Sequence, residues 1–168
     1  MSRTRQFLAQ ACALPLILAM ICGKPVSAST PVLAWDGARS LGVQCLVDPA
    51  TLPDRRRLQS VLCERVRTLA ADQAPIPVVV LAPGDPALIA ADTAVLLFHA
   101  NVQLAGGGHD RLLVFSLRAF RATAAPSELF GAAPRATPLP GGGSNPQFDA
   151  AVNAALAETL PWRLPRAP

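Results

Sequence analysis

Apolar and polar positions alternate in two-residue steps over three segments of the chain, and this period predicts β-strands. The three segments are residues 41–47, 98–104 and 112–121. Glycine-rich residues 105–110 join the last two, which predicts an antiparallel hairpin. A continuous apolar run at 76–82, rich in β-branched residues and bounded by prolines, predicts one more strand, buried in a sheet.

Two other segments repeat their apolar residues with the 3.6-residue period of a helix. The first is expected from Thr51 and should fade near residues 72–74, before Pro75, and Thr51 with Asp54 resembles a capping box. Its expected buried stripe consists of Leu58, Val61, Leu62, Val66 and Leu69, with Arg65 at the edge. The second helix is expected to begin with Asn145 as its cap and Pro146 as its first residue.

The resulting order β-α-β-β-β-α predicts an α+β fold, with two helices packed on one face of a small mixed or antiparallel sheet. Residues 122–147 are rich in alanine, proline and glycine and follow neither period, so we expect a mobile surface loop without regular structure there. Trp35 and Trp162 flank the predicted elements, and we expect both to pack back against them.

A different pattern occupies residues 1–28. Two arginines precede an apolar run at 7–22, and the small-residue sequence Val-Ser-Ala follows at 26–28. This order is typical of a secretory signal peptide. We therefore expect cleavage after Ala28, which leaves residues 29–168 as one domain in the periplasm or outside the cell.

Two alternatives to cleavage follow from the same segment. The apolar run has about 16 residues, whereas a membrane-spanning helix needs roughly 20, so an uncleaved membrane anchor is disfavoured. Lipidation of Cys22 is disfavoured because Ile21 precedes it, where a small residue is required. Contact with a membrane is expected only if the segment is retained as an anchor.

Removing the leader changes the charge. The full chain has a net charge of +4, but Arg3, Arg5 and Lys24 lie in the leader. The 15 basic residues less these three leave 12 against 11 acidic residues, a net charge of +1. A nearly neutral domain gives no electrostatic reason to expect binding of nucleic acid.

Cys45 and Cys63 are the two cysteines of the expected mature domain. In an oxidising compartment an isolated pair of this kind predicts a disulfide. Their separation of 18 positions excludes a CxxC redox centre. His99 and His109 are the only histidines that could join them as metal ligands, and their spacing does not match a structural zinc site.

Two groups of residues are candidates for binding. His99, Asn101 and Gln103 share the solvent-facing side of one predicted strand. Arg55, Arg56 and Arg57 stand in the first turn of the first predicted helix, where cations oppose the helix dipole. Such a run is usually a solvated helix end, but guanidinium groups also suit carboxylates and phosphates, so an anionic partner is the functional interpretation.

The sequence shows no recognisable catalytic constellation. There is no G-x-S-x-G turn, and the two glycine triplets lack the lysine and the flanking strand and helix of a phosphate loop. We therefore assign no catalytic residue, metal ligand or cofactor, and expect an exported non-enzymatic protein that binds another envelope protein or an anionic polymer. The alternative is an exported hydrolase whose site is assembled around His99.

Overall fold

The computed structural model describes residues 35–49, 52, 54–104, 111–123, 130–139 and 145–163. Within these ranges six strands form one sheet: β1 (Ser40–Asp48), β2 (Val78–Val80), β3 (Thr93–Leu104), β4 (Arg111–Phe120), β5 (Phe130–Gly131) and β6 (Arg135–Pro138). Two α-helices, α1 (Arg55–Ala71) and α2 (Pro146–Thr159), and a short 3-10 helix at Pro86–Ile89 complete the described elements. The predicted α+β class and the order of its six principal elements are confirmed. The strand expected at 76–82 was wrong in being buried, because only Val78–Val80 form β2, at the edge of the sheet, and Val79 and Val80 are each 43% exposed.

The sheet is mixed. Its strand order is β2-β1-β3-β4-β5, and β6 also pairs with β4. β1 lies between β2 and β3 and runs parallel to both, whereas β3 and β4 form a long antiparallel hairpin. Pairing along β1 is unequal, because β3 pairs with it from Ser40 to Asp48 and β2 pairs with it only from Leu41 to Val43.

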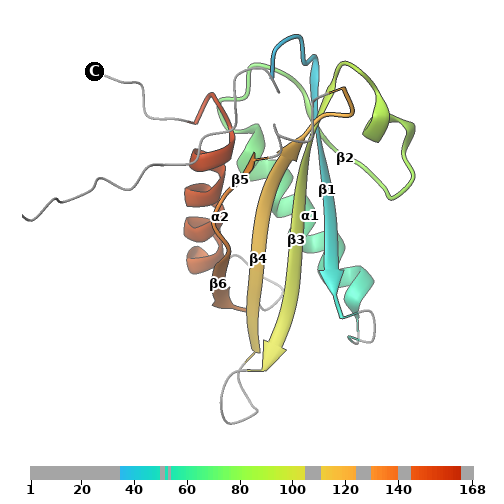
Figure 1. The fold of residues 1–168 in the computed structure, drawn as a ribbon. Coiled ribbons are helices and arrows are strands. Elements are labelled where there is room, and N and C mark those ends of the chain that lie inside the picture. The colour runs from blue at the N-terminus through green and yellow to red at the C-terminus, as the bar shows by residue number, and fades with distance from the viewer. Residues whose placement is uncertain are drawn as a thin grey trace, which may run out of the picture.

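Both helices cover the same face of the sheet (Figure 1). Phe148 of α2 packs edge-on against Phe98 of β3 and Phe115 of β4, with ring centroids 6.2 and 5.8 Å apart. Leu62 and Val66 of α1 belong to the same buried cluster. Burying these aromatic and aliphatic side chains is the main source of the domain's stability.

The two helices begin differently. Asn145 caps α2 as predicted, because its side chain accepts hydrogen bonds from the backbone N–H groups of Gln147 and Phe148. The capping box expected for α1 was wrong, because its acidic residue, Asp54, does not bond to the helix end. Asp54 has a left-handed backbone with φ of 57° and makes no side-chain cap bond, and the helix starts only at Arg55. Thr51 lies outside the described residues.

The buried face of α1 also differs from the prediction. Val61 was expected inside but is 48% exposed, whereas Cys63 is 5% exposed. The inner face of the helix consists of Leu62, Cys63, Val66 and Ala70, and Cys63 is bonded there to Cys45 of β1. The helical period identifies residues that share one side of a helix, but the centre of the buried side can differ by about one residue. One residue corresponds to a rotation of roughly 100° about the helix axis.

Residues 122–147 were expected to lack regular structure, and this was wrong for two short segments. β5 and β6 lie within them and pair with β4. In β6, Thr137 is 5% exposed, and Arg135 forms an ion pair with Glu158 of α2 at 2.5 Å. Tertiary pairing with β4, rather than any local hydrophobic period, holds these residues in the sheet.

The aromatic residues that flank the domain meet each other. Trp35 and Trp162 pack edge-on with centroids 5.4 Å apart, and both lie against the core as predicted. The expectations for residues 1–28, His109 and Gly141–Gly143 concern positions outside the described residues. Among the described residues, no helix has the length and apolar character needed to cross a membrane.

Candidate functional site

A groove lies beside β1 where β2 ends. Its volume is about 390 Å³. Three elements line it: the second half of β1, the first turns of α1, and the segment that leaves β2. The lining residues are Cys45, Leu46, Arg55, Arg56, Gln59, Ser60, Cys63, Val80, Leu81, Ala82 and Pro83. Two of the three candidate arginines therefore belong to a concave surface.

The arginines of this groove carry its charge. Arg55 is half-buried, and its Nη1 lies 3.5 Å from the Val47 carbonyl oxygen and 3.4 Å from Gln59 Oε1, both at the long limit for a hydrogen bond. Arg56 is exposed and makes no side-chain hydrogen bond to any described residue. The described lining holds two guanidinium groups and no carboxylate, so it is suited to an anion.

Arg57 does not join the other two. It is exposed on α1 and does not line the groove. The run of three arginines thus separates into two that face the groove and one that faces away, because successive helical positions are rotated by about 100°.

The sequence analysis missed the groove's other polar residues. Gln59 and Ser60 follow Arg55 and Arg56 by four positions, so they lie on the same face of α1 one turn later. This i,i+4 spacing is a signal that could have identified them. No local pattern points to Leu46 or to residues 80–83, which reach the groove only through the sheet.

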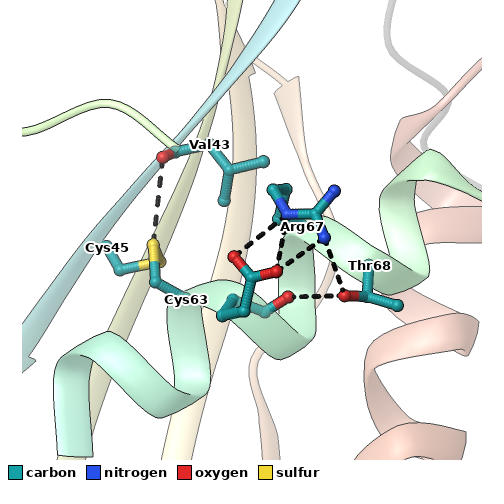
Figure 2. The surroundings of a disulfide bond; sticks show 6 residues. Val43, Cys45, Cys63, Arg67 and Thr68 are labelled. Atoms are coloured by element: carbon teal, nitrogen blue, oxygen red, sulfur yellow. Dashed lines mark hydrogen bonds and ion pairs between the residues drawn. A yellow bond between two sulfur atoms is a disulfide. The ribbon is translucent and has the colours of Figure 1, made fainter. Parts of the chain in front are cut away.

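The predicted disulfide is present and forms part of the groove wall. Cys45 of β1 and Cys63 of α1 are joined, with Cα atoms 5.6 Å apart (Figure 2). Cys63 Sγ also approaches the Val43 carbonyl oxygen at 3.8 Å. A disulfide sulfur carries no hydrogen, so this approach is a packing contact. The bond joins α1 to β1, and both cysteines belong to the lining of the groove.

Two ion pairs on α1 lie outside the groove. Glu64 and Arg67 pair along the exposed helix surface, and the hydrogen bond from Arg67 lowers the pKa of Glu64 (Figure 2). Arg65 instead reaches Asp149 in the first turn of α2, and its hydrogen bonds lower the pKa of that carboxyl. These arginines have carboxylate partners, whereas Arg56 of the groove pairs with no carboxylate of the described residues.

The second group of candidates lies on the open face of the sheet. His99, Asn101 and Gln103 are all exposed, and α1 and α2 both lie on the other face of the sheet (Figure 1). His99 Nε2 lies 2.9 Å from Asp48 Oδ2, and Ser116 stands directly opposite His99 in the β3–β4 register. A carboxylate, an imidazole and a hydroxyl are therefore neighbours, although no hydrogen bond joins Ser116 to His99 among the described contacts.

The open face has a groove of its own, with a volume of about 560 Å³. Leu97, Arg118, Ala119, Phe120, Gly131 and Ala132 line it. Neither this groove nor the one beside α1 includes His99 in its lining. Within the described residues, no group of three or more histidine, cysteine, aspartate or glutamate side chains is arranged to hold a metal ion.

Comparisons with known proteins give little further information. No protein-family model matches the chain, and no curated protein matches it. Among solved structures, a PelC dodecamer from Paraburkholderia phytofirmans is similar with a TM-score of 0.45 and 13% identity, over 83% of this chain and 95% of that one. A second PelC dodecamer from that organism, carrying a leucine-to-methionine change, has a TM-score of 0.41 and 12% identity, over 77% and 91% of the two chains. Both likenesses are too distant to support an inference about function.

Proposed function

We propose that this chain is an exported, non-enzymatic binding protein, and that the groove beside α1 binds an anionic macromolecule of the cell envelope. The observation that carries the proposal is the placement of Arg55 and Arg56 in a concave surface whose described lining holds no carboxylate. Guanidinium groups without a carboxylate partner are available for charge-assisted hydrogen bonds to an incoming anion.

Export is supported by two independent features. The leader pattern at residues 1–28 is that of a signal peptide, and the Cys45–Cys63 disulfide is typical of oxidising compartments. Expression of the full chain in a bacterial host tests this part. We expect mass spectrometry of the envelope fraction, alkylated without reduction, to find a chain that begins at Ser29 with its two cysteines joined. Accumulation of the uncleaved chain in the cytosol with free thiols would contradict export.

Binding is tested with poly-L-glutamate as the anionic probe. We expect the Arg55→Glu/Arg56→Glu variant to bind it at least about 10-fold more weakly than the wild type, because two charge-assisted contacts are replaced by repulsion. The matched control is Arg39→Glu/Arg111→Glu, which makes the same change in net charge at two exposed positions that do not line the groove. Equal weakening by both variants would show that only net charge matters and would refute the groove as the site.

The groove variant is expected to fold. Arg55 and Arg56 lie in the first turn of α1, where a carboxylate interacts favourably with the helix dipole and a cation does not. Thermal unfolding should therefore give a midpoint equal to or slightly above that of the wild type. A large decrease would mean that the arginines stabilise the fold, and the binding result would then be read from Arg56→Gln alone.

A hydrolase centred on His99 is the second candidate function. The 2.9 Å contact between His99 and Asp48 favours it, because a carboxylate can orient an imidazole as a general base. Hydrolysis of p-nitrophenyl acetate is the test. Turnover that is lost in His99→Ala and retained in Arg55→Glu/Arg56→Glu would favour the hydrolase over the binding protein.

A further inference from the structure

The groove on the open face of the sheet is separate from the one beside α1 and has a different lining. Its volume of about 560 Å³ lies in the range of pockets that hold small organic ligands. Arg118 supplies the one charged side chain of the described lining, and Leu97 and Phe120 supply the large apolar ones. Gly131 and two alanines complete it. The groove therefore combines a single guanidinium with an apolar surface.

The strand register brings these side chains together. Leu97 of β3 pairs with Arg118 of β4, and Phe120 follows Arg118 by two positions on the same strand. Residues two apart in a strand share a face, and directly paired residues have Cβ atoms about 5 Å apart. Leu97 and Phe120 are half-buried, so part of each side chain is accessible to a ligand.

Gly131 of β5 makes room for the aliphatic stem of Arg118. The two residues are paired in the sheet, and a Cβ atom built on Gly131 would lie 2.8 Å from Arg118 Cγ. It would also lie 2.8 Å from the Leu117 carbonyl oxygen, so a larger residue at position 131 would force a shift. Because β4 lies between β3 and β5, the stem leans toward β5 and away from Leu97.

The charge of Arg118 is available to a ligand. Its side chain is exposed and forms no hydrogen bond or ion pair with the residues that the structure describes. The described lining of the groove also holds no carboxylate. A guanidinium can donate two parallel hydrogen bonds to one carboxylate. The apolar side chains beside it favour a hydrocarbon over a second charged group.

We propose that this groove binds an aliphatic monocarboxylate, such as a free fatty acid, with the carboxylate on Arg118 and the hydrocarbon chain against Leu97 and Phe120. This second site goes beyond the proposed function, because it lies on another face and takes a different class of ligand. A polyanion suits the groove beside α1, whose described lining holds two guanidinium groups. In the open-face groove, a second negative charge would meet no described cation.

Isothermal titration calorimetry with octanoate tests the proposal, and 1-octanol is the probe of equal chain length without the charge. We expect the wild type to bind octanoate at least about 10-fold more tightly than octanol, because only the carboxylate pairs with Arg118. From butanoate to octanoate, the affinity should rise about 2- to 4-fold for each methylene group, since each one buries more apolar surface. Equal binding of octanoate and octanol, or an affinity independent of chain length, would overturn the proposal.

Variants assign the two parts of the ligand to residues. Arg118→Gln should weaken octanoate binding about 10-fold or more and leave octanol binding within about 2-fold of the wild type. Leu97→Gln should weaken both ligands, by about 3-fold or more. Arg111→Gln is the matched control, because it removes an exposed arginine of the same strand that does not line the groove, and it should leave octanoate binding unchanged.

Two further results decide the outcome. If octanoate binding is lost in Arg55→Glu/Arg56→Glu and kept in Arg118→Gln, the carboxylate binds beside α1 and the second site is refuted, while the proposed function stands. Arg118→Gln changes an exposed side chain, so its midpoint of thermal unfolding should match that of the wild type. If that variant does not fold, the comparison of octanoate with octanol on the wild type decides by itself.

Discussion

Among the individual residues of this domain, Asp149 has the clearest electrostatic role. It lies in the first turn of α2, where a negative charge favours the helix dipole, and Arg65 of α1 donates two hydrogen bonds to it, from Nε at 2.8 Å and from Nη2 at 2.5 Å. The bidentate pair therefore joins the two helices. The Asp149 side chain is 19% exposed and that of Arg65 is 40% exposed, so solvent weakens the pair relative to a buried one.

Replacing Asp149 by asparagine is expected to lower the free energy of unfolding by about 1 kcal/mol near neutral pH. The folded-state pKa of Asp149 lies below its ordinary value of 3.8 because of the bonds from Arg65. Its contribution is thus fully present above the unfolded pKa and disappears as the pH falls through the folded pKa. Urea denaturation should show the difference between wild type and variant near pH 7 and its decrease as the pH falls below 3.8.

Glu64→Gln provides the control for this prediction. Glu64 pairs with Arg67 on the exposed surface of one helix, and its side chain is 59% exposed. Exposed pairs of this kind contribute little, so its removal should change stability only slightly at either pH. An Asp149→Asn deficit that is the same at low and neutral pH would show that the carboxylate charge is not its cause.

Among the elements, the short edge strand β2 and the residue that follows it pack against a glycine of the neighbouring strand, Gly42 of β1. Gly42 is the third residue of β1, lies opposite Val79, and is buried beneath Leu81. A Cβ atom built on Gly42 would lie 2.1 Å from Leu81 Cδ1 and 2.7 Å from Leu81 Cγ. Leu81 can therefore fold over the sheet, where it is 5% exposed, only because position 42 is glycine.

Gly42→Ala is accordingly expected to destabilise the protein by about 1–3 kcal/mol, although alanine is otherwise preferred to glycine in a strand. The added methyl group must displace Leu81, which is truncated in the companion variant Leu81→Ala. In the double variant the clash is absent, so its loss of stability should be smaller than the sum of the two single losses. Urea denaturation of all four proteins measures the coupling, and additive losses would contradict the packing described.

For the molecule as a whole, the disulfide connects the sheet to the helical layer. Cys45 is 2% exposed in β1 and Cys63 is 5% exposed in α1, and both belong to the core cluster that spans sheet and helices. A cross-link at this place restricts the unfolded chain and keeps α1 against β1. Because two of the groove's walls come from these elements, the same bond preserves the shape of the candidate site.

We expect Cys45→Ala/Cys63→Ala to lower the free energy of unfolding by about 3 kcal/mol, the chain-entropy value for a loop closed over a separation of 18 residues. Urea denaturation with and without reductant is the measurement. Reductant should destabilise the wild type by a similar amount and leave the double variant unchanged. Equal stability of the oxidised and reduced wild type would show that the disulfide does not stabilise the fold.

The features that were predicted correctly depend on residues that are close together in the sequence. Asn145 followed by Pro146 begins α2 as expected, because a cap and a first-turn proline act within a few residues of each other. The alternation around His99 placed its side chain correctly on the solvent-facing side of β3. Its expected binding role remains a prediction, since exposure alone does not identify a ligand.

The features that the sequence analysis predicted wrongly or did not predict have a different cause. β6 has no hydrophobic period, and it forms because β4 supplies hydrogen-bond partners from a distant part of the chain. Val61 was expected in the buried stripe of α1 but is exposed, whereas Cys63 is buried and bonded to Cys45 of β1. The groove combines Leu46, Arg55 and Val80, which come from three elements and share no motif. Contacts between distant parts of the chain determine such features. The hydrophobic pattern of one short segment contains no information about those contacts.

By itself, then, the sequence determined the α+β class, the principal strands and helices with their order, the cap of α2 and the cysteine pair, because short-range periodicity, capping and composition specify each of them. Only the tertiary structure decided which residues of α1 are buried, the recruitment of two strands from a proline- and glycine-rich segment, and the meeting of two arginines with residues of β1 and β2 in one groove. These depend on which distant surfaces pack together, and packing is settled by the free energy of the whole fold.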